Sequence, residues 1–446
     1  MIGTDYMWIL VGVLLVVVLL GVNVAVALGV TAVLGIYLMR GDFETVYAFI
    51  GSTAYESLRD YIFAVLPLFM LMGDFLGKCG AVGDLYALVN RLTRWIPGRL
   101  AIATVLANAL FAFISGVSLA AAAAFSRISY PEMKRNGYDR RFALGSIAGS
   151  ACLGMLIPPS VLMIVWGVLT EQSIGKIFIA GIIPGFILVA FYCGYILWVA
   201  ITKPEMVGED TASQNRRAEA AVGNDERSGL AVFWSTMAVF ALVAGTLGGI
   251  WLGLFTPTEG AGVGAMLALL MSIAKGLRAK EIYEVILTVG RTCAPILLLL
   301  FAAQLYSRTL SMTGITGAAQ AYFVSSGLGP YEVLALMIAA WFLLGCLIDS
   351  ISIILLTVPV FAPVAQAMGF DPIAFAIIGI LAIETGLLTP PFGLLVFAVR
   401  SVQPTEATVG ELFRAVVPYW TCLFLTICTI VIYPPLATWL PYLSNK

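Results

Sequence analysis

Long apolar runs, each about as long as a bilayer is thick, follow one another along most of the chain. A membrane-spanning helix needs about 20 mostly apolar residues, whereas the strands of a membrane barrel are short and alternate between polar and apolar positions. The pattern therefore predicts an all-α polytopic membrane protein. The runs lie near 7–39 (room for two short spans), 61–77, 99–125, 142–170, 174–201, 229–254, 260–275, 282–306, 331–357, 372–399 and 412–436.

Composition agrees with this fold class and excludes several functions. Of the 446 residues, 61% are hydrophobic and 11% are charged, whereas soluble domains carry about 25% charged residues. The net charge of −1 argues against a nucleic-acid partner, and the lack of histidine removes the usual proton shuttle. The seven cysteines contain no CxxC pair and are interpreted as small buried hydrophobes. Because no hydrolase, P-loop or dinucleotide-binding motif occurs, we expect neither an enzyme nor an organic cofactor.

Two pairs of adjacent prolines interrupt apolar runs, in CLGMLIPPS (152–160) and in TGLLTPPFG (385–393). Proline has no backbone N–H and crowds the preceding turn, so each pair should break a helix. A packing kink is the alternative explanation for a single pair. Helix breaks are predicted at Pro158, Pro159, Pro390 and Pro391.

An internal repeat relates the two breaks. Sliding the sequence against itself by 232 residues superimposes both proline pairs and needs no gap from 118 to 159. Leucine or glycine matches are frequent in so biased a chain, but several prolines and an aspartate at one offset indicate a duplication. The offset also places Gly154 on Gly386, Asp139 on Asp371, Pro131 on Pro363 and Ser118 on Ser350.

Charge indicates that the two copies have opposite orientations. The loop 127–141 contains five basic residues, and its counterpart 359–373 contains none. Basic residues are retained on the cytoplasmic side, so the pattern predicts an inverted-topology repeat, a plan typical of secondary transporters. That the second loop simply lost its basic residues remains the alternative. We divide the chain into a first half, 1–201, a polar linker, 202–228, and a second half, 229–446. The first span has no basic segment before it and is expected to be a retained helix.

Small polar residues also interrupt an apolar run upstream of each break, in FISGVSLAAAAAF (113–125) and LGCLIDSISIILL (344–356). Irregular backbone at membrane depth is tolerated only where protein or a cavity satisfies its polar groups. Freed carbonyls together with serine and aspartate oxygens would form a pocket suited to a small hard cation such as sodium. The positive ends of the half-helices could face an anionic substrate.

Acidic residues in apolar segments are costly and therefore informative. Asp349 is the strongest candidate for cation coordination. Glu384 is either a ligand or a group whose hydrogen bonds stabilise the second break. Glu259 follows Thr256 in FTPTEG, which favours a helix cap over an ion site. Asp139 and Asp371 are expected to be N-caps.

The chain resembles the large membrane subunit of tripartite ATP-independent periplasmic (TRAP) transporters over nearly its whole length. The motifs that carry the resemblance are PEMKRNGYDRRFALG (131–145), LIPPS (156–160), GIIPG (181–185), FTPTE (255–259) and TGLLTPPFG (385–393).

The resemblance implies a sodium-driven elevator transporter with two re-entrant hairpins, located in the bacterial cytoplasmic (inner) membrane, with sodium as coupling ion. It also implies a separate small four-helix membrane subunit and a periplasmic substrate-binding protein. The substrate would be a small organic anion of the C4-dicarboxylate, sialic acid, 2-oxoacid or sulfonate class. The alternative functions are a stand-alone sodium-coupled anion carrier without a binding protein and, less favoured without a histidine, an intramembrane enzyme.

Candidate sodium ligands follow from the same resemblance. Val117 departs from the family, where many members have a small hydroxyl residue, so no side-chain role is expected there. The implied ligands are Ser115, Gly116 and Ser118 with Gly154 and Pro158 in the first site, and Asp349, Ser350 and Ser352 with Gly386 and Thr389 in the second.

Overall fold

The computed structural model describes residues 2–208 and 229–443, and within these ranges the chain is helical without β-strands. Most of the predicted polar linker, 209–228, lies outside the described residues. The part of the linker that is described continues α11, turns at Pro204, and pairs Val207 with Tyr138 in an isolated bridge.

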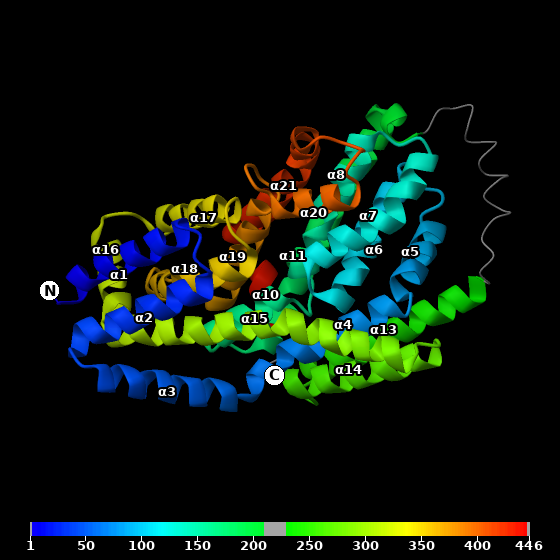
Figure 1. Ribbon diagram of the computed structural model, residues 1–446. Coiled ribbons are helices and arrows are strands. Elements are labelled where there is room, and N and C mark those ends of the chain that lie inside the picture. The colour runs from blue at the N-terminus through cyan, green and yellow to red at the C-terminus, as the bar shows by residue number, and fades with distance from the viewer. Residues whose placement is uncertain (1, 209–228, 444–446) are drawn as a thin grey trace.

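The helices of the two halves are arranged as an elongated bundle (Figure 1). The first half contains α1 (Ile2–Leu19), α2 (Val24–Arg40), α3 (Phe43–Arg59), η1 (Tyr61–Ala64), α4 (Val65–Lys78), α5 (Ala81–Leu92), α6 (Arg99–Ser115), α7 (Ser118–Arg135), α8 (Arg140–Ala151), α9 (Leu153–Leu156), α10 (Val161–Thr170), α11 (Ile174–Thr202) and η2 (Pro204–Met206). The second half contains α13 (Gly229–Trp251), α14 (Pro257–Ala274), α15 (Ala279–Met312), α16 (Ile315–Ser325), α17 (Pro330–Gly345), α18 (Ser350–Ala367), α19 (Pro372–Gly386), α20 (Leu394–Val402), α21 (Val409–Ile432) and α22 (Pro435–Leu443).

Eight helices of the described chain are long and apolar enough to cross a membrane. Their outer faces expose large apolar side chains, including Phe186, Trp198 and Ile432, which is 81% exposed. Such a surface suits contact with lipid, because lipid tails impose no penalty on exposed apolar groups. All seven cysteines are free and lie buried or partly buried, as predicted. The fold is that of an all-α polytopic membrane protein.

The hairpins and helix breaks occur at matching positions in the two halves. Each hairpin consists of two helices joined by a short turn, α6–α7 in the first half and α17–α18 in the second. The second limbs begin at Ser118 and Ser350 and end at Arg135 and Ala367, which are both pairs separated by the 232-residue offset. The apolar runs 99–125 and 331–357 are therefore hairpins, and 142–170 and 372–399 are broken helices.

Helices from the two halves interleave in space. Along one edge of the molecule, α2 and α4 of the first half pack against α15 and α14 of the second (Figure 1). Deeper in the bundle, α7 packs against α20, and its counterpart α18 packs against α10, the counterpart of α20. Because each hairpin packs on the helix that follows the other half's break, neither half can bury its apolar faces alone.

Capping interactions set the helix starts that follow the polar loops. Asp139 accepts hydrogen bonds from the backbone N–H groups of Arg141 and Phe142 at the start of α8. Asp371 accepts equivalent bonds at the start of α19, and Thr256 and Glu259 form a reciprocal capping box at α14. These hydrogen bonds confirm the three capping predictions. Each capping side chain satisfies N–H groups that a helix start leaves unpaired.

Of the described helices, four were not among the predicted apolar runs, α3, α5, α16 and α22, because they are short or carry charged and polar residues. The amphipathic α3 is attached to α15 through Arg308. This arginine pairs with Glu56 at 2.7 Å, donates to Thr53 at 3.0 Å and lies over the Phe49 ring. Its cationic end is therefore partnered within the protein.

A polar cluster joins α7 to the loop that follows α20. Glu406 accepts hydrogen bonds from Lys134 at 2.6 Å and from Tyr130 at 2.7 Å. These donors stabilise the carboxylate and lower the pKa of Glu406 below its usual range. Gln403 adds a bond to the carbonyl of Ser126 at 2.9 Å. The cluster links the first hairpin to the second half at the end of the molecule that carries the basic loop.

Candidate functional site

The tip of the first hairpin lies directly against the first helix break. Gly116 ends α6 with φ +61°, a left-handed conformation that favours glycine. Its carbonyl accepts a hydrogen bond from Val161, the first residue of α10, at 3.2 Å. A Cβ on Gly116 would lie 2.3 Å from the carbonyl oxygen of Pro159. The contact joins the two irregular segments through backbone, with no room for a side chain.

Other predicted members of the first site lie at the same point. A Cβ on Gly154 would lie 3.2 Å from the Cα of Ser118, so α9 approaches the hairpin closely. The Oγ of Ser115 is buried and has no hydrogen-bond partner in the described structure. Because its lone pairs have no donor in the protein, this oxygen is available to contact an ion or a water. Pro158 follows in the break, joined to Pro159 by a cis bond.

The second hairpin meets the second break in a similar manner. Gly345 and Gly386 are in such close contact that a Cβ on Gly386 would lie 2.6 Å from the Cα of Gly345. Thr389 donates to the carbonyl of Gly386 at 2.8 Å and lies 2.9 Å from the thiol of Cys346. The peptide bond between Pro390 and Pro391 is also cis. Hydroxyl and carbonyl oxygens are thus gathered at both breaks.

Asp349 occupies the turn of the second hairpin, where it caps α18. Its carboxylate accepts from the backbone N–H of Ser352 at 3.0 Å and from the Ser352 hydroxyl. The residue is exposed at the surface of the chain. The equivalent position in the first half is Val117, which offers α7 no side-chain cap. Asp349 therefore holds its charge at the hairpin turn rather than inside the protein.

Glu384 is the carboxylate that the structure buries between the two hairpins. The residue is 1% exposed, and it accepts hydrogen bonds from Ser118 at 2.7 Å and from Ser350 at 3.4 Å. The Cys152 thiol lies 3.8 Å from the backbone carbonyl oxygen of Glu384. Ser118 and Ser350 are equivalent in the repeat, and so are Cys152 and Glu384. Equivalent residues of two copies touch only near the axis that relates them, so Glu384 lies close to that axis.

Sequence reasoning identified Glu384 as a candidate but did not find its partner in the first half. The sequence does show that Glu384 has no acidic counterpart in the first half, because the 232-residue offset aligns it with Cys152. The contact of both Ser118 and Ser350 with Glu384 could not be predicted from the sequence, because it depends on how the two halves pack.

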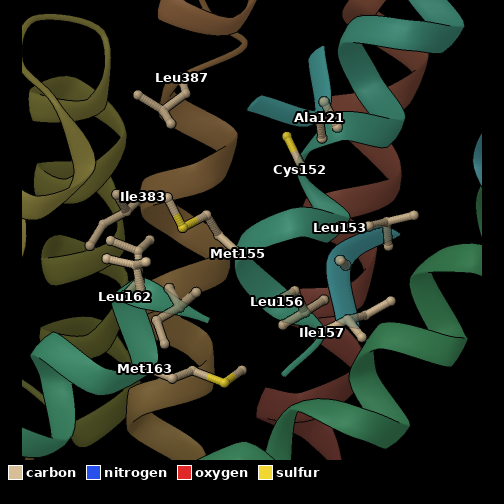
Figure 2. Packing of buried hydrophobic residues seen from close by; sticks show 14 of the residues in the cluster. Ala121, Cys152, Leu153, Met155, Leu156, Ile157, Leu162, Met163, Ile383 and Leu387 are labelled. Carbon is tan, nitrogen blue, oxygen red and sulfur yellow. The ribbon is translucent and has the colours of Figure 1, made fainter. Parts of the chain in front are cut away.

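Apolar side chains enclose the breaks (Figure 2). The segment from Cys152 to Ile157 packs with Leu162 and Met163 at the start of α10. It also packs with Ile383 of α19 and with Leu387, the residue after that helix. Beside the second break, a groove of about 780 Å³ between α17 and α21 reaches Cys346 and Thr389 and is lined mainly by aliphatic and aromatic residues. The oxygen atoms at the breaks thus lie in apolar surroundings, where an interaction with an ion is stronger than in water.

One known protein family matches this chain over nearly its whole length. The family model described as "Tripartite ATP-independent periplasmic transporter, DctM component" matches residues 11–436. The chain belongs to this family. It is therefore a transporter permease subunit, a membrane protein that is not an enzyme, as the sequence motifs predicted.

Individual relatives agree with the family assignment. The chain is 33% identical over 383 residues to the C4-dicarboxylate TRAP transporter large permease protein DctM of Pseudomonas aeruginosa, covering 85% of this chain and 86% of that protein. It is 28% identical over 430 residues to the ectoine TRAP transporter large permease protein TeaC of Halomonas elongata, covering 96% and 97%. Relatives of this TRAP permease chain thus serve chemically different solutes.

A solved structure supports the fold. The chain superimposes on the Alcanivorax borkumensis YdaH transporter, whose structure is described as having an unusual topology, with a TM-score of 0.65. The match covers 91% of this chain and 90% of that chain at 15% sequence identity. At this identity the likeness concerns the arrangement of helices in the TRAP permease chain and not its substrate.

Proposed function

We propose that this chain is the translocating subunit of a sodium-coupled, binding-protein-dependent secondary transporter that imports a small organic anion by an elevator mechanism. The observation that carries the proposal is the convergence of two hairpin tips on two proline breaks within a TRAP large permease. The chain would act in the bacterial cytoplasmic membrane, with a small four-helix membrane subunit and a periplasmic substrate-binding protein as partners.

Sodium is the coupling ion that the oxygen atoms favour. Near the first break they include the orphaned hydroxyl of Ser115 and the hydroxyl of Ser118, and near the second those of Thr389 and Ser350. Hydroxyl and carbonyl oxygens are hard ligands and suit small hard cations. The ligands proposed at each break are those implied by the family resemblance, with Asp349 contributing its charge from the turn of the second hairpin.

An anionic substrate is favoured by the helix start at the tip of the first hairpin. The second limb of the first hairpin begins at Ser118, and Val117 before it supplies no side chain to cap the first N–H groups. Unpaired N–H groups and the helix dipole favour negative charge at such an end. We propose a carboxylate or sulfonate substrate, such as a C4-dicarboxylate, sialic acid, 2-oxoacid or sulfonate.

Elevator movement would be consistent with how the breaks pack. The hairpins and broken helices bury their contacts against one another across the two halves, while α2, α4, α14 and α15 line one edge, where α4 contacts α6 and α15 contacts α18 (Figure 1). A group that is held together by its own core can move as one body past its neighbours.

Opposite orientation of the two halves is tested by cysteine labelling. Arg135 and Ala367 are equivalent in the repeat, end α7 and α18, and are both exposed. In a background with the native cysteines replaced, we expect an Arg135→Cys variant to react with a membrane-impermeant maleimide only from the cytoplasm. An Ala367→Cys variant should react only from the periplasm. Labelling of both from one side would contradict the inverted repeat.

The proposed function is tested by uptake into proteoliposomes that contain this chain and its small membrane partner. With an imposed sodium gradient, we expect uptake of a radiolabelled organic acid only when the periplasmic binding protein is added. Potassium in place of sodium is the control for the gradient. Uptake without the binding protein would support the alternative, a stand-alone sodium-coupled carrier. Uptake indifferent to sodium would contradict the coupling ion.

A further inference from the structure

Glu384 carries a carboxylate in a place where the protein supplies no positive charge. Its side chain is 1% exposed, and within the described residues no lysine or arginine forms an ion pair with it. Its carboxylate accepts hydrogen bonds from two serine hydroxyls, and the Cys152 thiol also contacts its side chain. A buried charge is costly unless it is paired, so an ionised Glu384 needs a cation from outside the chain.

The two serines connect this carboxylate to both breaks. Ser118 begins the second limb of the first hairpin, in contact with Gly154, and Ser350 begins the second limb of the second hairpin beside Asp349. Each hydroxyl has one hydrogen, and in both cases it points to Glu384. A hydroxyl that donates its hydrogen keeps its lone pairs as acceptors, so each oxygen can still act as a ligand.

We propose that Glu384 is the shared counter-charge and positioning residue of both ion sites, acting through Ser118 and Ser350. The inference rests on the proposed sodium coupling and assigns a role to a residue that need not touch either ion. A hydroxyl that donates to a carboxylate is more strongly polarised and is fixed in orientation, which improves it as a ligand. A single charge between two sites also attracts a cation at each of them.

The repeat explains why one such residue is sufficient. Cys152 stands at the equivalent position in the first half, and its thiol contacts the backbone of Glu384. A second carboxylate at that position would place two like charges side by side in a buried environment, which is strongly unfavourable. One acidic residue near the axis can serve both hairpins, because both serines reach it.

The test measures sodium binding rather than transport. Ions that bind only the folded state raise the thermal unfolding midpoint once their concentration exceeds their dissociation constant, and the rise then follows the logarithm of that ratio. The full chain, purified from membranes in detergent, is heated at increasing sodium, with choline holding ionic strength constant. Groups that hydrogen-bond to the ligands of an ion typically contribute about 10- to 100-fold to ion affinity, so we expect Glu384→Gln to lower apparent sodium affinity by about that factor. Glu406→Gln, the same change outside the breaks, should show the same dependence of the unfolding midpoint on sodium as the wild type.

A second variant separates charge from packing. Glu384→Asp keeps the charge on a shorter side chain, so it should retain more of the sodium response than Glu384→Gln. If the glutamine variant does not fold, the aspartate variant is compared with the wild type instead. Equal loss in the two variants would overturn the role of charge. In a double-mutant cycle, Ser118→Ala should cost less sodium affinity in the Glu384→Gln background than in the wild type. Ser129→Ala is the matched control, because this buried serine bonds only to its own helix at Phe125.

The outcomes distinguish this inference from the proposed function. If sodium does not raise the unfolding midpoint of the wild type, sodium coupling itself fails and the role of Glu384 falls with it. If the wild type responds and Glu384→Gln responds with the same affinity, only the counter-charge role is overturned. That second result would describe a carboxyl whose charge contributes nothing to sodium binding.

Discussion

Replacing Gly116 by alanine is expected to reduce sodium-driven uptake by about 100-fold. The added Cβ would lie 2.3 Å from the carbonyl oxygen of Pro159, which is backbone and cannot rotate away. The hairpin tip must therefore move from the first break, and a displacement of about 1 Å in a positioned site can cost about 100-fold in rate. Uptake is measured in proteoliposomes and normalised to the amount of inserted chain.

A control isolates the steric effect from backbone strain. Gly41 has φ +77°, close to the +61° of Gly116, but a Cβ there would meet nothing within 4 Å. Gly41→Ala should therefore cost only the left-handed penalty of about 1 to 2 kcal/mol in stability, with uptake largely retained. Equal uptake by Gly116→Ala and the wild type would mean that contact between hairpin and break is not needed for transport.

Replacing Asp349 by alanine is expected to abolish sodium-coupled uptake without preventing membrane insertion. The substitution removes a charge at the turn of the second hairpin and also the cap of α18, whose loss costs about 1 kcal/mol. Asp349→Asn separates the two roles, because asparagine caps helices about as well as aspartate but carries no charge. If the charge helps to bind sodium, the asparagine variant should need about 10-fold more sodium for half-maximal uptake.

Asp139→Asn provides the matched control for this pair. Asp139 also caps a helix through two backbone N–H groups, but it lies in the loop before α8 rather than at a hairpin turn. Its sodium dependence should not change. If Asp349→Asn behaves as the wild type while Asp349→Ala fails, Asp349 acts as a cap and not as a sodium ligand.

Much of the candidate site was predictable because its signals are local. A proline pair breaks a helix wherever it occurs, and the breaks at Pro158 and Pro390 lie where the motifs placed them. The N-caps at Asp139 and Asp371 depend on residues two or three positions away, so they too could be predicted. The helices α3, α5, α16 and α22 were missed because they are short or of mixed polarity and so give no long apolar run.

The environment of each acidic residue could not be predicted in the same manner. Asp349 and Glu384 both interrupt apolar segments, and from composition alone both would be costly to bury. The structure exposes Asp349 at a turn and buries Glu384 against Ser118, a residue 266 positions away. This difference follows from the packing of one half on the other, which the pattern of a single segment does not contain.

The sequence by itself determined that this is a membrane protein, that it is duplicated, and where its helices break. Each of these properties depends on the length of an apolar run, the chemistry of proline, or a match between two segments of the same chain. Only the tertiary structure decided that both hairpins meet at one carboxylate and that Cys152 touches Glu384 across the repeat. The physical reason is that these contacts join residues distant in sequence, and they form because interleaved halves bury apolar surface that neither half can bury alone.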